Sequence, residues 1–226
     1  MRRLLTTLAV ACALLLAAAR ADAQIHWDAS AQVGFMKRNL VDRPTGAARD
    51  ATVGPAGQLS GHVALLPLVR LGAYFGHDIS PFQGDASARD ITWGGLRAKI
   101  MSPWPRGDAR AWLFVGFGYA GVYQRSTSMT VGAPGPAPGG AQTERVVHGA
   151  GGGFFEVPFG IGASYKLRKP WELCAELGAR AGFGHSGSAY DSPGPRTTSE
   201  SGESNMAPAG IDRFGFGLTV GVLVDL

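Results

Sequence analysis

The clearest pattern in the chain is a strict alternation of apolar positions with polar or small ones over residues 154–184. Every second residue is apolar from Phe155 to Leu167, and again from Trp171 to Phe183. Successive side chains of a strand point to opposite faces, so a period of two predicts strands and not helices. We therefore expect two long antiparallel strands joined by a tight turn at residues 168–170.

The two faces of this hairpin differ in composition. One face is apolar over about thirteen residues, which exceeds the roughly 5 to 6 residues of an ordinary strand and suffices for the 9 to 11 of a tilted membrane strand. The other face is mostly glycine with a few acidic and basic residues, as suits a crowded lumen. We therefore expect the apolar face to contact lipid and the charges to lie inside a barrel.

The same alternation recurs along the chain and predicts eight strands. Polar stretches rich in glycine and proline separate them, and long and short connections alternate, as in a meandering barrel with two different ends. We expect the long loops outside the cell and the short turns in the periplasm. The expected strands are 25–37, 58–66, 68–76, 91–101, 109–124, 155–167, 171–184 and 213–226, and the long loops are 39–57, 77–90, 125–152 and 185–210.

Three local features refine this pattern. The pair Gly94-Gly95 is typical of a β-bulge in strand 91–101. In the hairpin, a register counted outward from the turn places Lys166 opposite Glu172. Segment 109–124 is apolar on both faces, which leaves its phase open; we favour the phase that points Leu113, Val115, Phe117 and Tyr119 toward lipid.

Aromatic residues are expected at two levels of the barrel. Packing in a core would explain any one of them, but not their joint restriction to two levels, which is typical of membrane interfaces. The expected short-turn level contains Trp27, Trp104, Trp112 and Trp171, and the opposite rim contains Phe35, Phe75, Tyr123, Phe155, Phe183 and Phe214.

The beginning of the chain has the features of a secretory signal peptide. Two arginines precede an apolar stretch over residues 4–19, and residues 21–23 read Ala-Asp-Ala. A membrane anchor is the alternative, but the apolar stretch is short and interrupted by two threonines. We expect cleavage of residues 1–23 and a single barrel domain over residues 24–226.

Charge and cysteine content exclude several kinds of function. The formal net charge of +4 falls when the arginine-containing signal peptide is removed, and no Lys/Arg stripe follows, so nucleic acid is not an expected partner. Cys174 would then be the one remaining thiol, which cannot form an internal disulfide. His26, His62 and His148 are scattered without metal-ligand spacing, so we expect no metal and no cofactor.

The alternation and the final segment FGFGLTVGVLVDL, residues 214–226, resemble the small eight-stranded outer-membrane barrels: the OmpA-like transmembrane domain and the OmpX-like and OmpW-like proteins. The resemblance covers residues 24–226 and implies an all-β, antiparallel up-and-down transmembrane β-barrel in the outer membrane of a Gram-negative bacterium. It also implies a monomer that contacts outer-membrane lipid and engages the barrel-assembly machinery through its last strand. Such proteins usually end on an aromatic residue, whereas this chain ends on Leu226.

Charges on the expected inner face are the most specific candidate site. Eight strands enclose only enough space for side chains, so charges of both signs are expected to pair and plug the lumen. This predicts a structural or surface-interaction protein and no enzyme, with the partner of the long loops left open. The set is Asp28, Arg70, Arg97, Lys99, Glu156, Lys166, Glu172, Glu176, Arg180, Arg213 and Asp225.

Two alternatives remain open at this stage. A narrow small-molecule channel of the OmpW-like kind is favoured by the many lumenal glycines and by an inward phase of Trp112, Phe114 and Val122. A lipid A-modifying enzyme, loosely resembling a lipid A deacylase, would use rim residues, although its His-x-Ser spacing is not reproduced. Those rim residues are His77-Asp78 and His185-Ser186-Gly187-Ser188.

Overall fold

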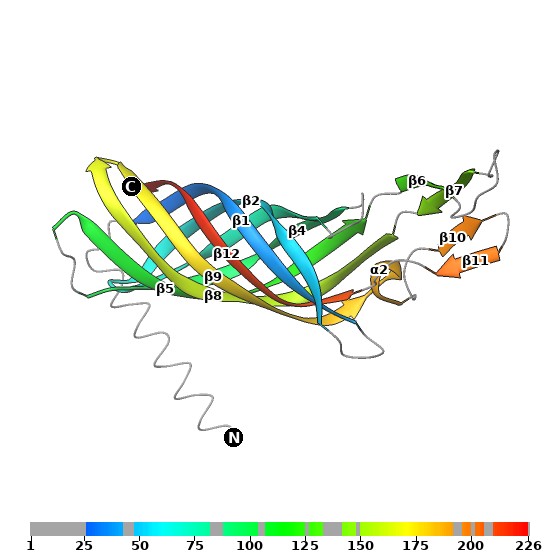
Figure 1. The fold of residues 1–226 in the computed structure, drawn as a ribbon. Coiled ribbons are helices and arrows are strands. Elements are labelled where there is room, and N and C mark those ends of the chain that lie inside the picture. Colours follow the sequence, from blue (N-terminus) through cyan, green and yellow to red (C-terminus); the bar gives the residue numbers. More distant parts are fainter. Residues whose placement is uncertain are drawn as a thin grey trace, which may run out of the picture.

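The computed structural model describes residues 26–42, 48–81, 88–103, 107–124, 127–132, 142–147, 150–191, 196–199, 202–205 and 210–225. Eight antiparallel strands of this part form a closed barrel, in which the last strand pairs with the first (Figure 1). They are β1 (Trp27–Asp42), β2 (Ala48–Leu66), β3 (Val69–Pro81), β4 (Ala88–Met101), β5 (Ala109–Gln124), β8 (Ala150–Arg168), β9 (Trp171–Ser186) and β12 (Gly210–Asp225). The expected all-β up-and-down barrel is confirmed.

Some expectations fall on other parts of the chain. The signal peptide, Trp104, His148 and Leu226 lie outside the described residues. Cleavage before residue 24 and the role of the final residue therefore stay predictions.

Alternation determines which side chains enter the barrel. The outer wall carries exposed apolar residues on all eight strands, and the inward positions are buried. The phase preferred for β5 is confirmed, because Leu113, Val115 and Phe117 are exposed while Trp112 and Phe114 are buried. Trp112 therefore lies in the lumen and not in an interfacial belt, whereas Trp27 and Trp171 are exposed near the short turns as expected.

The hairpin register is also confirmed. Lys166 pairs with Glu172 and Phe159 with Ala179 across β8 and β9. In contrast, the bulge expected at Gly94-Gly95 is wrong, because β4 keeps one continuous register with both neighbouring strands.

Seven of the eight barrel strands, all except β5, extend further toward the loop end than their sequence predicts. Residues 39–57 were expected to form a loop, but β1 continues to Asp42 and β2 begins at Ala48. Residues 77–81 and 88–90 likewise belong to β3 and β4. These extensions contain glycine, proline and aspartate, which have low intrinsic strand propensity. They are stabilised as strands by backbone pairing with the adjacent strands.

The pairing of β1 with β12 contains a bulge at this extended end. Asn39 pairs with Phe214, but Leu40 pairs with Asp212, so Arg213 is the extra residue. The bulge reverses the expected phase: Asp212 is buried and Arg213 is exposed. The prediction that Arg213 points into the lumen is therefore wrong.

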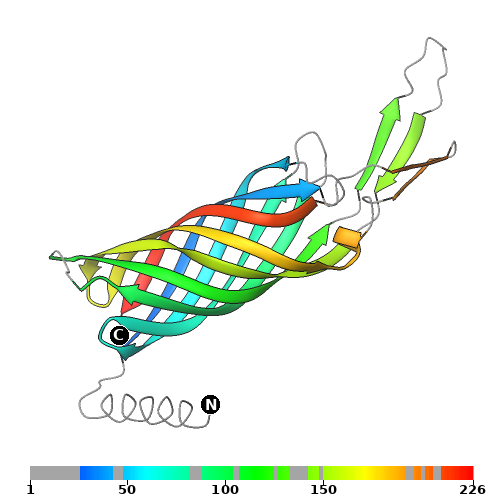
Figure 2. The same ribbon diagram turned by 90° about the horizontal axis from the view of Figure 1, so that it is seen from below.

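Two of the expected long loops contain additional elements. Hairpins β6 (Thr127–Gly132) with β7 (Gln142–Val147) and β10 (Arg196–Ser199) with β11 (Gly202–Asn205) form one four-stranded sheet. Figure 2 shows this sheet beyond one end of the barrel, next to the short helix α2 (Ser188–Asp191). Among the described residues, no helix is long and apolar enough to cross a membrane.

Candidate functional site

The lumen contains a connected set of charged side chains, beginning near the short turns. The buried Asp28 carboxylate accepts a hydrogen bond from Lys99 Nζ at 3.1 Å and lies 3.0 Å from His62 Nδ1. Its second oxygen accepts from Arg70 at 2.7 Å. One carboxylate from β1 therefore links side chains from β2, β3 and β4.

Arg70 extends this set to the far side of the barrel. It also donates to Asp225 on β12 at 2.9 Å, and Asp225 accepts from Arg110 on β5 at 2.9 Å. Arg110 is in turn ion-paired with Glu172 on β9. These bonds form a connected set of alternating charges at the short-turn end.

A second group surrounds Glu176 in the middle of the lumen. Its Oε2 accepts from Arg97 at 2.8 Å and from Gln58 at 2.9 Å, and its Oε1 accepts from Trp112 Nε1 at 3.2 Å. Arg97 lies over the Phe114 ring, 4.9 Å from its centroid. The carboxylate thus has partners on both oxygens although it is buried.

His62 connects these two groups and has a defined tautomer. Arg97 Nε is a permanent donor and lies 3.2 Å from His62 Nε2, so Nε2 must accept. The proton is therefore on Nδ1, which donates to Asp28. His62 consequently acts as a neutral bridge between a buried cation and a buried anion.

Toward the loop end, Arg180 and Glu156 form a buried ion pair. Tyr74 donates to the same Glu156 oxygen at 3.2 Å. The guanidinium carbon of Arg180 also lies 3.5 Å from the centroid of the Trp93 ring, an arrangement that favours a cation–π contact. Arg180 on β9 lies diagonally across from Glu156 on β8, because the register pairs Arg180 with Pro158.

The last lumenal pairs lie at the extended ends of the strands. Arg38 binds Asp78 through two nitrogens at 2.7 and 2.8 Å, and Trp93 Nε1 donates to Asp78 at 2.7 Å. Arg89 donates to Asp212 at 2.8 Å. All four charged residues are buried.

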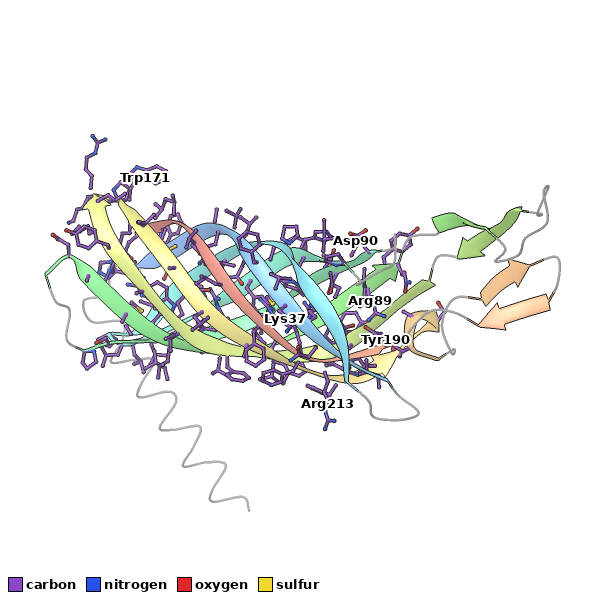
Figure 3. All side chains as sticks on the ribbon, in the orientation of Figure 1. Lys37, Arg89, Asp90, Trp171, Tyr190 and Arg213 are labelled. Carbon is purple, nitrogen blue, oxygen red and sulfur yellow. The ribbon has the colours of Figure 1, made fainter. Side chains whose placement is uncertain are left out.

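Helix α2 covers this end of the lumen. Figure 3 shows Tyr190 next to Arg89, and its hydroxyl donates to Asp212 at 2.8 Å. Burial and the nearby Asp212 carboxylate raise the pKa of Tyr190, so the hydroxyl stays a neutral donor. The Tyr190 ring packs edge-on against Phe154 and against His185.

Glycines opposite the large rings leave space that these rings occupy. A Cβ at Gly76 would lie 2.1 Å from the Trp93 ring, and one at Gly162 would lie 2.3 Å from the Trp112 ring. Such distances are well below van der Waals contact. The high glycine content of the inner face thus accommodates tryptophan side chains inside a narrow barrel.

Most of the charges expected in the lumen are there. Lys166 is half-buried and lies opposite Glu172, but Glu172 is bound by Arg110 and Ser164. Arg213 is outside, as described above. The residues placed in the lumen are Asp28, Arg70, Arg97, Lys99, Glu156, Glu172, Glu176, Arg180 and Asp225.

Sequence reasoning missed several members of the set. Arg38 and Asp78 continue the inward alternation of their strands and would have been found if those strands had been extended. In the described part of the lumen, the residues that form ion pairs with one another include as many acidic residues as lysines and arginines. The missed charged members are Arg38, Asp78, Arg89, Arg110 and Asp212.

The structure places the residues considered for catalysis in different surroundings. His77 is exposed on the outer wall, with Nδ1 3.0 Å from Thr92 Oγ1, whereas Asp78 is inside with Arg38. His185 Nε2 lies 3.0 Å from the backbone oxygen of Asp212, and Ser188 hydrogen-bonds to the backbone of Gly151. Within the described ranges, no group of histidine, cysteine and acidic residues has metal-site geometry.

Comparison with solved structures supports the same architecture. Neisserial surface protein A (NspA) is similar with a TM-score of 0.53 and 10% identity, over 88% of this chain and 97% of that one. A major outer membrane protein from Thermus thermophilus gives a TM-score of 0.52 and 12% identity, over 89% and 99% of the two chains. No protein-family model and no curated protein matches the sequence. The chain therefore has the fold of small outer-membrane barrels, in agreement with the expected location.

Proposed function

We propose that the protein is a closed, monomeric barrel of the outer membrane that acts as a structural element and presents surface loops. The observation that supports this most strongly is the pairing of lumenal charges. Ion pairs lie near the short turns, in the middle and at the loop end, as in Arg70–Asp28, Arg97–Glu176 and Arg89–Asp212. A lumen of this kind resists the passage of solutes.

Separating buried charges from their partners costs free energy, which would oppose the passage of solutes. An ion or solute would have to displace side chains that are hydrogen-bonded to one another. Removing one partner of a buried pair costs about 3–5 kcal/mol. Because such pairs follow one another along the lumen, passage would require several of these separations.

A small-molecule channel is the second candidate, based on the inward apolar residues of β5. Trp112 and Phe114 pack with Cys174 and Leu223, and Val122 belongs to a cluster with Trp93. These side chains pack against one another, which supports the closed barrel over the channel.

The outer wall and the loops would provide the interactions of such a protein. The exposed apolar band fits membrane lipid, and the last strand, β12, would be the segment that engages the assembly machinery. The sheet of β6, β7, β10 and β11 would extend the surface available to an external partner. The proposal assigns no catalytic group.

Solute uptake by proteoliposomes tests this function. The full chain without residues 1–23 is inserted into phospholipid vesicles, and insertion is checked by a folded band that shifts on heating. We expect swelling in a small sugar such as arabinose to match that of empty vesicles, while a general porin gives rapid swelling. Swelling well above the empty-vesicle rate would favour the channel.

A further inference from the structure

Two basic side chains lie on the outer wall of the barrel near its loop end. Lys37 on β1 and Arg213 on β12 are exposed, and Figure 3 shows Arg213 projecting away from the barrel. Their strands are hydrogen-bonded neighbours. The register places Lys37 beside Phe216 and Arg213 just beyond the pair of Asn39 with Phe214. These cations therefore share one side of the barrel.

The fold imposes the outward direction of Arg213. It is the extra residue of the bulge between β1 and β12, which turns Asp212 inward to Arg89. Bulges commonly re-aim a side chain in this way. Reverting the phase would bury Arg213 and expose Asp212, so the lumenal ion pair and the external cation depend on the same bulge.

Aromatic residues lie beside the two cations on the same outer wall. Phe35 precedes Lys37 on the same face of β1 and is 63% exposed. On β12, the rings of Phe214 and Phe216 lie 4.8 Å apart. The wall therefore combines apolar rings with positive charge, which complements the acyl chains and the headgroup of an anionic lipid.

The loop-end parts of β3 and β4 have a different chemistry. Their outer wall presents His77 and Thr92, which are in hydrogen-bonding contact, and Asp90, whose carboxylate lies 3.9 Å from His77 Nε2. A carboxylate disfavours an anionic headgroup. The β1–β12 side, with its two cations, is therefore more complementary to an anionic headgroup than the β3–β4 side.

We propose that Lys37 and Arg213 bind a phosphate of lipid A, the phosphorylated glycolipid of the outer leaflet, while Phe35, Phe214 and Phe216 contact its acyl chains. Basic side chains at a membrane surface attract anionic headgroups. The inference rests on the membrane location in the proposed function, but not on a closed lumen.

Lipid binding to the folded protein in detergent micelles tests this site. Native mass spectrometry is used to titrate bisphosphorylated lipid A and its dephosphorylated counterpart. We expect tighter binding of the phosphorylated form, and a loss of about fivefold in affinity for each cation removed, or roughly 25-fold for Lys37→Gln with Arg213→Gln. Arg168→Gln with Lys169→Gln, at the exposed turn, removes the same charge and should leave affinity unchanged.

Each other outcome has a defined meaning. Equal affinity of the Lys37/Arg213 variant and the wild type would overturn the site, as would an equal loss in the turn variant. Release of the lipid by inorganic phosphate would assign a free-anion site instead. Lys37→Arg with Arg213→Lys should retain binding, and heat-shifted migration confirms folding of every variant. Conduction by the wild-type protein would contradict the closed lumen, but it would not change the interpretation of the lipid-binding measurement.

Discussion

The half of the lumen near the short turns and the half near the loops differ in how their buried charges are hydrogen-bonded. Near the turns, Asp28 and Glu176 each have both carboxylate oxygens bonded, by groups that come from strands alone. Near the loops, one oxygen of Glu156 and one of Asp212 are buried without a hydrogen-bond partner. That end also depends on α2, which enters from a loop. If the lumen is closed as proposed, we expect the end near the loops to open more easily than the fully hydrogen-bonded end near the turns.

The largest expected difference between the halves comes from removing a carboxylate in each. Glu176→Ala would leave Arg97 buried without its main partner, so we expect the free energy of unfolding to fall by about 3–5 kcal/mol. Glu156→Ala should cost less, because it removes bonds to one carboxylate oxygen only and also removes a second oxygen that is buried without a partner. Urea unfolding in lipid vesicles measures both. Equal losses would show that the halves do not differ.

A smaller effect should be confined to the loop end. Tyr190→Phe removes the hydroxyl bond to the Asp212 carboxylate, while Arg89 still donates to the same oxygen, so we expect the cost of one bond to a charged group, about 1.5–3 kcal/mol. We expect faster hydrogen exchange in residues 187–191, with unchanged exchange around Glu176. The matched control is Tyr165→Phe, whose side chain is exposed on the outer wall. Accelerated exchange throughout the barrel would contradict a separate closure by α2.

The smallest expected effect comes from the two lumenal tryptophans. Trp112→Phe loses the bond to Glu176, and Trp93→Phe loses the bond to Asp78, while each carboxylate keeps an arginine partner. We expect each change to cost about 0.5–1.5 kcal/mol, with the larger drop in the melting midpoint for Trp112→Phe, because Glu176 Oε1 loses this bond while Asp78 Oδ1 keeps Arg38. A much larger loss of stability for one variant would show that packing of the tryptophan rings, and not hydrogen bonding of the carboxylates, determines the difference between the two halves.

The two halves also differ in how far the sequence predicts them. Alternation alone places Arg97 and Glu176 inside, because their strands are regular and their partners share one face. It fails at Arg213 because a bulge depends on pairing across strands and not on local composition. It misses Tyr190 because a helix as short as Ser188–Asp191 shows no helical period. Specific ion-pair partners, such as Arg110 for Glu172, follow from the barrel geometry and not from the spacing.

Single-channel recording in a planar lipid bilayer tests the central claim, a lumen closed by paired charges, most directly. We predict no steady open-channel current for the folded protein or for Tyr190→Phe, because the strand-derived bonds around Asp28 and Glu176 stay intact in both. A stable ohmic conductance in the wild-type protein, proportional to the number of inserted barrels, would contradict the closed lumen.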